Sequence, residues 1–414
     1  MTDIAGTVPV IAVDKVQAVA LAVCTYYFGV WLKGKVGVLS RYSIPSPVVG
    51  GMSFAIVVSF LEYFNIVKVQ IDSTLQTVLM LGFFTTIGLM ASLRVVKDGG
   101  RLLLGFLLAV TVLVFLQNGM GMAIAEAMGF DKHYGILAGS VSMMGGLGTA
   151  AAFGPYFEET YGITGGTAVA VTAATFGMVA ALLIGGPFGE WCIRRYQVKT
   201  PDEVQQPEPE LHLPDDMDTD ITEQHASAKP NFTNEIMRAV SVTALAMGLG
   251  TIVSNYLGHY ITLPAYIGAM IVATVIRNVG DFSGMYKVEG KGLNAVADIT
   301  LVLFVTMAIN NLKLHELVHL ALPLVVILAC QTILMLIYAW TVLFTAFSRS
   351  YDAVMLSVGG IGFSMGATAN GLANMQAISE KYGSSPRAWL IVSVVGAFLI
   401  DLINAVVITW FGTL

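Results

Sequence analysis

The sequence predicts an all-α polytopic membrane protein with ten transmembrane helices, arranged as two inverted five-helix repeats that each carry a re-entrant Gly-rich hairpin. Three observations lead to this prediction. Hydrophobic residues make up 56% of the 414 residues and charged residues only 12%, about half the charged fraction of a soluble domain. The apolar residues are gathered in long runs of helical, membrane-spanning length. The two halves of the chain repeat the same order of runs and glycine-rich stretches.

Ten apolar runs are long enough to cross a bilayer, because each approaches the roughly 20 residues that a spanning helix needs and none alternates like a barrel strand. We expect the spans at 16–32, 47–66, 74–92, 102–128, 167–190, 236–257, 261–276, 294–312, 316–347 and 387–411. The N-terminal stretch lacks the basic region of a signal peptide. Cys24, Cys192 and Cys330 have no spacing typical of a disulfide or a cysteine metal site.

Two further apolar stretches, at about 135–160 and 353–380, contain too many glycines for a lipid-exposed helix. They include GILAGSVSMMGGLGTAAAFG and VGGIGFSMGATANGLANM, and each glycine destabilises a helix by about 1 kcal/mol relative to alanine. Irregular backbone is tolerated at membrane depth only where protein or a water-filled cavity surrounds it. We therefore expect two re-entrant hairpins with broken tips.

The distribution of basic residues supports the hairpins and predicts an orientation. With the N- and C-termini outside, and with both hairpins returning to the side they enter from, all but four of the 21 Lys and Arg residues fall in cytoplasmic links. The exceptions are Lys15, Lys68, Lys132 and Lys313. Such a cytoplasmic excess is what orients membrane proteins. Treating either Gly-rich stretch as a full span reverses the later links and removes the asymmetry.

One polar linker divides the chain into an N-terminal repeat at 1–193 and a C-terminal repeat at 236–414. The linker at 194–235 includes PDEVQQPEPELHLPDDMDTD, which is acidic and Pro-rich and has no apolar periodicity. We expect a disordered cytoplasmic connector. A site for a regulatory partner is the alternative interpretation.

The two halves align with each other most clearly across the Gly-rich stretches. Residues 139–162 and 360–383 align without a gap, and the shared residues include Gly139/Gly360, Met144/Met365, Gly145/Gly366, Ala152/Ala373 and Glu159/Glu380. Each fourth span also has a Gln near its middle, Gln117 and Gln331. Because five spans is an odd number, the second half must be inserted upside down. Inverted repeats with broken helices are the architecture of secondary transporters, which bind substrate and coupling ion near the membrane midplane.

The stretch HELVH at 315–319 raises an alternative from another class of protein. It matches the H-E-x-x-H pattern in which two His hold a catalytic zinc. Such a site also needs a third protein ligand and an open coordination position, but the other His residues fall in predicted links or the linker. We interpret the match as chance and expect no zinc and no enzymatic activity. A membrane zinc protease, and a channel lined by the hairpins, remain as alternatives.

At the hairpins and the segments around them the chain resembles the bacterial sodium/glutamate symporters, the glutamate:Na+ symporter (ESS) family. The resemblance runs nearly end to end and is carried by IPSPVVGG (44–51), FFTTIGL (83–89), LAGSVSMMGGLGTA (137–150), ATFGMVAALLIGGP (174–187), ALPLVVILACQTILM (321–335), SYDAVMLSVGGIGFSMGATANGLANMQAISEKYG (350–383) and VGAFLIDLINAVVI (395–408). It implies a homodimeric carrier of the bacterial inner membrane that imports L-glutamate or a close dicarboxylate. Sodium would be the coupling ion, no cofactor would be needed, and a hairpin core would move like an elevator against a scaffold.

The chain departs from the family pattern at both hairpin loops. Members commonly have Ser-Gly-Gly-His-Gly in the first loop, where this chain has Met144-Gly145-Gly146-Leu147-Gly148. In the second loop they often have Gly-Ala-Thr-Pro-Thr. This chain has Ala369 and Asn370 in place of the last two residues of that motif. These departures leave open a proton-coupled carrier, or a carrier of a different small carboxylate, on the same fold.

The predicted substrate site lies at the hairpin tips. No Lys or Arg lies deep in a predicted span, so backbone N–H groups and the positive ends of the short hairpin helices would hold an anion. The candidate substrate-binding residues are Gly145, Gly146, Gly148, Thr149, Gly366, Thr368, Asn370, Gly371, Asn374, Asp401 and Asn404. The alternative is that the glycines only permit close packing between helices.

Asp401 is the sharpest single candidate, because it lies near the centre of the last span, where an unpaired charge is costly. It would pair with the substrate ammonium group or bind sodium; the alternative is a protonated Asp hydrogen-bonded to a neighbouring helix. Sodium needs oxygen ligands, for which Thr86, Thr175, Asp401 and the hairpin carbonyls are candidates. Gln117, Asn118, Gln331, Asn310 and Asn311 are interpreted as hydrogen-bonding residues between helices.

Overall fold

The computed structural model describes residues 9–37, 39, 44–94, 100–201, 232–257, 265–284, 286, 290–314 and 319–414. These residues are mostly helical, and eight helices among them are long and apolar enough to cross a membrane. The prediction of an all-α polytopic membrane protein is therefore confirmed. Most of the predicted linker, 202–231, and residues 315–318 of HELVH lie outside the described residues.

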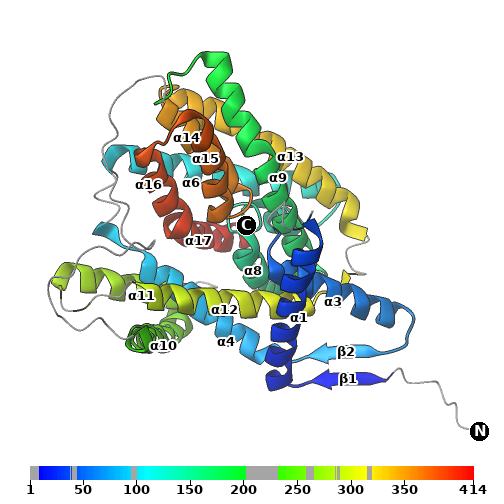
Figure 1. The fold of residues 1–414 in the computed structure, drawn as a ribbon. Helices are drawn as coiled ribbons and strands as arrows, with labels where there is room; N and C mark the ends of the chain where they lie inside the picture. Colours follow the sequence, from blue (N-terminus) through cyan, green and yellow to red (C-terminus); the bar gives the residue numbers. More distant parts are fainter. Residues whose placement is uncertain are drawn as a thin grey trace, which may run out of the picture.

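Among the described residues, the N-terminal half begins with the helices α1 (Lys15–Lys35), α3 (Ser46–Tyr63) and α4 (Thr74–Met90). A capping box starts α1, because the Asp14 side chain accepts hydrogen bonds from the N–H groups of Val16 and Gln17. Two short strands that the sequence did not predict, β1 (Val10–Val13) and β2 (Lys68–Ile71), pair in parallel. Since β1 leads into α1 and β2 into α4, this pairing places the starts of the two helices side by side (Figure 1).

The rest of this half contains a long helix, a hairpin and a second long helix. The elements are α6 (Gly100–Ala127), the first hairpin arm of α7 (Lys132–Ile136) and η1 (Leu137–Val141), the second arm α8 (Gly146–Tyr161), and α9 (Gly166–Tyr196). The C-terminal half repeats this order with α10 (Phe232–Leu257), α11 (Ala265–Ser283), α12 (Lys291–Asn310), α13 (Ala321–Tyr338) continued by η3 (Ala339–Ala346), the hairpin arms α14 (Tyr351–Ser364) and α15 (Thr368–Tyr382), and α16 (Pro386–Val394), η4 (Val395–Leu399) and α17 (Ile400–Gly412).

Two of the ten predicted spans are not among the eight long apolar helices. One coincides with α4, which is apolar but has only 17 residues. The other coincides with α11, which runs to Ser283, well past the predicted end at 276. Arg277, expected in a link, therefore lies inside α11, where it is 7% exposed. The number of spans remains a prediction.

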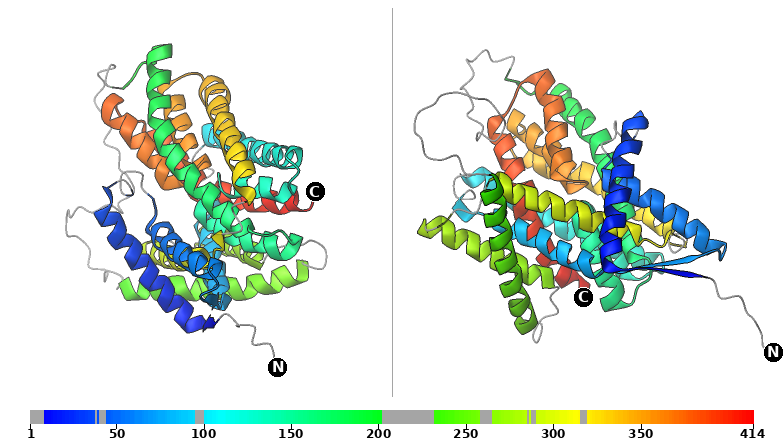
Figure 2. Two further views of the ribbon diagram at one scale, coloured as in Figure 1. Left: turned by 90° about the vertical axis from the view of Figure 1, so that its right-hand side faces the viewer. Right: turned by 60° about the horizontal axis from the view of Figure 1, so that its bottom comes forward.

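The helices form two bodies that each draw on both halves of the chain (Figures 1 and 2). The scaffold consists of α1, α3, α4, α10, α11 and α12, in which α4 packs against both α11 and α12. The hairpin body consists of α6, α9, α13 with η3, the two hairpins, and α16 with η4 and α17; here α9 packs against both arms of the second hairpin. The bodies meet where α8 packs against α12 and where α17 packs against α4 and α11.

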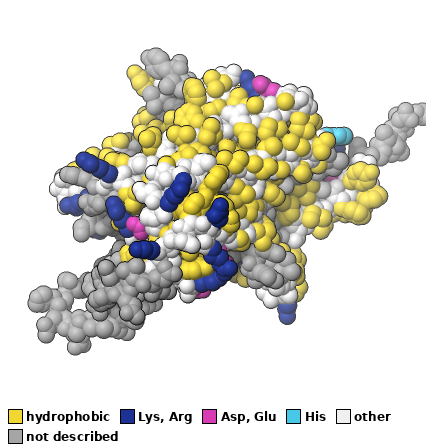
Figure 3. Space-filling view, turned by 90° about the horizontal axis from the view of Figure 1, so that it is seen from above, with side chains coloured by type: hydrophobic (Ala, Val, Ile, Leu, Met, Phe, Trp, Pro, Cys, Tyr) yellow, Lys and Arg dark blue, Asp and Glu magenta, His cyan; other side chains and the backbone are white. Residues whose placement is uncertain are grey.

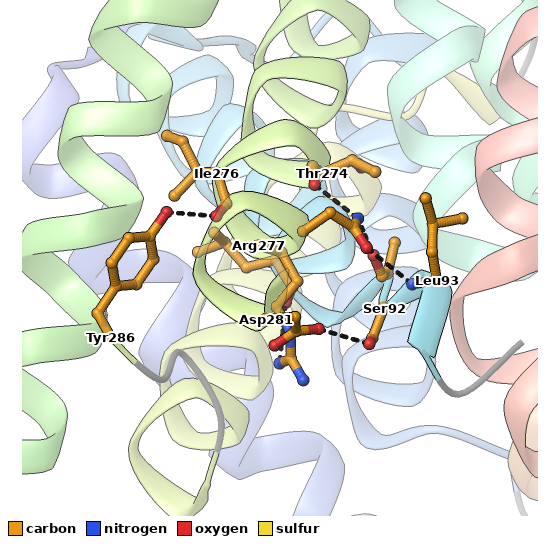
Figure 4. A network of polar contacts seen from close by, with 10 residues as sticks. Ser92, Leu93, Thr274, Ile276, Arg277, Asp281 and Tyr286 are labelled. Carbon is orange, nitrogen blue, oxygen red and sulfur yellow. Dashed lines mark hydrogen bonds and ion pairs between the residues drawn. The ribbon is translucent and has the colours of Figure 1, made fainter. Parts of the chain in front are cut away.

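A polar cluster joins the two halves within the scaffold (Figure 4). Asp281 of α11 accepts a hydrogen bond from Ser92 Oγ at 2.5 Å and pairs with Arg277 Nε at 3.0 Å. The Asn278 side chain accepts from the N–H of Leu93 at 2.8 Å. These bonds satisfy polar groups just after the end of α4 and offset the buried charge of Arg277, so they connect α4 firmly to α11.

The contact between the bodies includes an aromatic pair. Tyr266 of α11 stacks near Phe84 of α4, with ring centroids 4.7 Å apart, and meets Phe153 of α8 edge-on at 5.3 Å. Much of the face seen in Figure 3 is apolar, whereas the Lys and Arg side chains on this face gather toward one side. A surface of this kind is expected where lipid surrounds the protein.

Candidate substrate site at the hairpin tips

The two hairpins meet tip to tip inside the hairpin body. A Cβ atom added to Gly146, at the first tip, would lie 2.5 Å from the carbonyl oxygen of Gly366, at the second tip. Gly146 also has a φ of +62°, in the left-handed region that glycine adopts without strain. The contact is therefore made backbone to backbone, and it brings together two stretches that are more than 200 residues apart in the chain.

The backbone of the first hairpin arm is irregular, as expected from its glycines. Within the π-helical η1, Gly139 has the non-helical angles φ −90° and ψ −130°. Side chains from two neighbouring helices form hydrogen bonds with the backbone of the next residue, Ser140. Asn118 Oδ1 accepts from its N–H at 2.9 Å, and Asn404 Nδ2 donates to its carbonyl at 3.0 Å. The irregular segment is thus enclosed by protein and hydrogen-bonded.

A helix begins at each tip. The helix α8 starts at Gly146 after its N-cap Gly145, and α15 starts at Thr368 after its N-cap Ala367. Neither N-cap residue supplies a side-chain hydrogen bond. The first N–H groups of a helix have no partner within the helix and give its N-terminus a partial positive charge. Two such N-termini begin where the tips touch.

The polar side chains of the second hairpin reach outward to its neighbours. Thr368 Oγ1 donates to the Gly396 carbonyl at 2.5 Å, Asn370 Nδ2 donates to Met178 at 2.9 Å and Asn374 Nδ2 donates to Ala181 at 3.0 Å. These predicted substrate ligands therefore also fasten the hairpin to η4 and α9. Their role toward a substrate remains a prediction.

The predicted glycines differ in what surrounds them. A Cβ on Gly362 would lie 2.2 Å from the Gly371 Cα, so Gly371 serves the close packing of α14 on α15, as the packing alternative expects. Gly148 faces the scaffold, because a Cβ there would lie 3.0 Å from the ring of Phe83. Gly145 and Gly146 form the turn of the first tip, and a Cβ on Gly145 would lie 2.4 Å from the Cβ of Thr149.

Asp401 is half-buried in the first turn of α17, and no hydrogen bond or ion pair between described residues involves its carboxylate. The proposed neighbour Asn404 is buried and holds the first hairpin.

The hydroxyls of the two candidate sodium ligands Thr86 and Thr175 donate within their own helices, to Phe83 at 2.7 Å and Val171 at 2.8 Å. Thr86 belongs to the scaffold and Thr175 to the hairpin body, so these two candidates come from different bodies.

The amides interpreted as hydrogen-bonding residues between helices do act in this way. Gln117 Nε2 donates to the Ser364 carbonyl at 3.0 Å, and Gln331 Nε2 donates to the Gln117 carbonyl at 2.7 Å. Asn310 and Asn311 bond to Thr25 and Gln76 in the same manner. Sequence reasoning did not single out Ser140 or Ser364, although both are fully buried near the tips. The only signal for them was their place inside the Gly-rich arms.

A polar cavity of about 370 Å³ lies between the two bodies, beside α8. Its lining includes Gln76 of the scaffold, Glu158 and Thr167 of the hairpin body, and Asn311 and Lys313 after α12. It borders α8 at Pro155 and Glu158, farther along this helix from the tip.

Of the HELVH stretch only His319 is described, and it is exposed. The residues that the structure describes contain no group of three or more His, Cys, Asp or Glu placed to hold a metal ion.

The fold and the site together define a multi-pass helical membrane protein in which two hairpins meet inside one body that packs on a second. Comparison with known proteins gives this class a family. The sodium/glutamate symporter family profile matches residues 11–384. The chain is 37% identical over 400 residues to the sodium/glutamate symporters of Escherichia coli K12 and Shigella flexneri, with 95% of this chain and 96% of each relative covered. It is 34% identical over 395 residues to that of Haemophilus influenzae, with 94% and 95% covered.

The chain therefore belongs to the sodium/glutamate symporter family, which confirms the resemblance carried by the hairpin motifs. It is a transporter rather than an enzyme, and its bacterial relatives make it a multi-pass protein of the inner membrane.

Proposed function

We propose that the protein is a sodium-coupled symporter that imports L-glutamate or a closely related dicarboxylate. Family membership supports sodium-coupled transport of glutamate. The observation that carries the substrate class is the pair of helix N-termini, those of α8 and α15, that begin at the touching tips without side-chain caps. A helix N-terminus is a ready-made site for a carboxylate, and a dicarboxylate offers one carboxylate to each.

Asp401 would distinguish an amino acid from a simple dicarboxylate. A half-buried carboxylate without a partner among the described residues is costly within a membrane helix. A substrate ammonium group would supply the missing opposite charge. In this proposal Gly145, Gly146, Gly366 and the backbone beside them receive the carboxylates, while Asp401 receives the amine.

We further propose that the two halves are inverted repeats with ten spans, related by a two-fold axis through the hairpin body. Residues that correspond in the internal alignment lie together: Gln331 bonds to Gln117, and Gly366 contacts Gly146 beside Gly145. Residues near a two-fold axis meet their own counterparts, so these contacts support the symmetry. The gathering of basic side chains toward one side supports an orientation with both termini outside (Figure 3). A homodimer is expected from the family resemblance.

Transport would proceed by elevator-type movement of the hairpin body against the scaffold. Within the bodies, helices approach backbone to backbone, as where a Cβ on Gly88 of α4 would lie 2.3 Å from the Met270 carbonyl of α11. Between the bodies, the contact includes side chains, as where the rings of Tyr266 and Phe153 meet edge-on. Such a contact can slide without breaking backbone packing, and the cavity beside α8 would be an entrance to the tips.

Uptake of labelled L-glutamate into proteoliposomes tests the proposal. An inward sodium gradient is compared with an equal potassium gradient and with a pH gradient, and unlabelled dicarboxylates compete. Accumulation that requires sodium is the expected result. Accumulation driven by the pH gradient alone would replace sodium with protons as coupling ion. No glutamate uptake, together with uptake of another small carboxylate, would assign the altered loop residues Leu147 and Asn370 to a different substrate.

A further inference from the structure

Three buried oxygen atoms beside the second hairpin tip have no hydrogen-bond partner in the described structure. They are Gln117 Oε1 of α6, Gln331 Oε1 of α13 and Ser364 Oγ of α14. Each of these residues is at most 1% exposed. A buried polar atom without a partner is strongly disfavoured, and in native proteins such atoms usually have a bound water or ion. The three residues are joined to one another by hydrogen bonds, so these oxygens call for an occupant.

The hydrogen bonds of the two amides determine that oxygen, not nitrogen, is the atom left over. The Gln117 amide donates through Nε2 to the carbonyl of Ser364, and the Gln331 amide donates through Nε2 to the carbonyl of Gln117. Exchanging O and N in either amide would place its oxygen against a carbonyl oxygen. These two hydrogen bonds connect the three residues in series, from Gln331 on α13 through Gln117 on α6 to Ser364 on α14. In these three residues, each buried side-chain atom without a partner is an oxygen.

The backbone at this point also favours a positive charge. Ser364 is the last residue of α14, a helix of 14 residues, and the final carbonyls of a helix carry its partial negative charge. Among the described residues Arg277 is the only buried Lys or Arg, and it belongs to the scaffold cluster around Asp281. No buried basic side chain of the described residues is therefore assigned to the three oxygens. Oxygen atoms beside a helix C-terminus inside a membrane protein are the kind of ligands with which broken helices bind sodium.

We propose that Gln117, Gln331 and Ser364 bind the coupling sodium ion. This inference rests on the proposed sodium symport and names a site different from Thr86 and Thr175. The cluster has no carboxylate of its own, so a lone cation there would be poorly compensated. The N-terminus of α15, proposed to hold a substrate carboxylate, begins only four residues after Ser364, at Thr368. Sodium and substrate would therefore stabilise each other, and by linkage each would raise the affinity for the other equally.

A buried water molecule is the competing occupant, because it would also satisfy the three oxygens. Water and sodium are distinguished by binding of ²²Na⁺ to purified wild-type protein and to Ser364→Ala. The Ser364 hydroxyl has no partner in the described structure, so its removal should leave folding intact. Loss of one ion ligand should raise the sodium concentration for half-saturation about tenfold.

Ser357→Ala is the matched control, because Ser357 lies on the same helix, is equally buried and donates its hydroxyl within the helix to Ala353 at 2.7 Å. It should bind sodium like wild type. Gln331→Leu is the second test variant, accepted for comparison if it elutes as a single folded species. It should weaken sodium binding at least as much as Ser364→Ala.

Unchanged sodium half-saturation in both Ser364→Ala and Gln331→Leu would overturn this site and leave sodium symport standing. A wild-type protein that accumulates no glutamate on a sodium gradient would overturn the proposed function instead. In that case ²²Na⁺ binding weakened by Ser364→Ala would still support a sodium site here, and absence of ²²Na⁺ binding would overturn the site as well.

Discussion

The two hairpins occupy equivalent places in their halves but differ in which of their groups bond to neighbouring helices. Neighbouring helices reach into the first hairpin, where Asn118 and Asn404 bond to the backbone of Ser140. The second hairpin reaches out through two amides, Asn370 and Asn374, which donate to carbonyls of α9. In the first hairpin the Ser142 hydroxyl makes a similar bond to Ala170 of α9. The difference follows from the backbone. The irregular η1 leaves both backbone groups of Ser140 to partners on other helices. In the regular helix α14 the carbonyl bonded by a neighbouring helix is that of the last residue, Ser364, which accepts from Gln117.

The largest effect is expected from closing the space between the arms of the second hairpin. In Gly362→Ala the new methyl group would lie 2.2 Å from the Gly371 Cα and 2.3 Å from its nitrogen, and backbone cannot give way as a side chain can. We expect loss of folded protein and of uptake, measured by size-exclusion chromatography and proteoliposome transport. Gly186→Ala is the control, because a methyl group there meets nothing within 4 Å. Normal folding and uptake in Gly362→Ala would refute the close packing of the arms.

The contact between the tips is tested by Gly146→Ala. The substitution combines the strain of φ +62° with a clash against the Gly366 carbonyl at 2.5 Å, and left-handed backbone alone disfavours alanine by about 1–2 kcal/mol. We expect glutamate uptake to fall at least tenfold while the protein remains folded. Gly162→Ala has a similar φ of +70° but open space, and so separates backbone strain from the clash. Equal losses in both variants would show that contact between the tips is not required.

Asp401 and Asn404 lie one turn apart on α17 with contrasting roles: Asn404 holds the first hairpin, whereas Asp401 has no partner among the described residues. We expect the thermal stability of Asp401→Asn to equal or exceed that of wild type, because the substitution removes an unpaired carboxylate from a membrane helix. Its uptake of L-glutamate should fall about tenfold, because the substrate ammonium loses its opposite charge. Competition by glutarate, which lacks the amine, should change little. Unaltered glutamate uptake would remove Asp401 from the site.

The smallest expected effect is a difference in thermal stability between two variants, each of which removes one hydrogen bond that holds a hairpin. Asn118→Ala leaves the Ser140 N–H of the irregular arm without its acceptor, at a cost of about 1–3 kcal/mol. Asn374→Ala removes a bond to the carbonyl of Ala181, which lies within the regular helix α9, and should cost about 1 kcal/mol or less. Thermal unfolding in detergent should rank Asn118→Ala as the less stable variant. The reverse order would contradict the comparison of the hairpins.

Composition and glycine patterning predicted much of this arrangement. The apolar runs predicted the long helices. The two glycine-rich stretches are where the backbones of Gly146 and Gly366 approach closely, and their re-entrant character remains a prediction. The ends of helices were less predictable. The helix α11 continues past Arg277 because Asp281 and Ser92 compensate the charge, and that compensation depends on packing against α4, which no local pattern reveals.

Within the candidate site, residue type alone did not separate ligands from structural residues. Asn370 and Asn374 have the polar groups that a substrate site needs, yet both donate to α9. Ser364 is an unremarkable serine in the sequence, and only its burial beside Gln117 and Gln331 singles it out. Unsatisfied atoms are a property of three-dimensional packing, so they could not be predicted from composition or spacing.

The central claim is that the touching tips hold the substrate together with sodium. Binding of labelled L-glutamate to purified protein, measured with sodium and with potassium, tests it most directly for wild type, Gly146→Ala and Gly162→Ala. The account predicts sodium-dependent binding by wild type and by Gly162→Ala, and at least tenfold weaker binding by Gly146→Ala. Binding that is independent of sodium, or that Gly146→Ala leaves unchanged, would contradict the account.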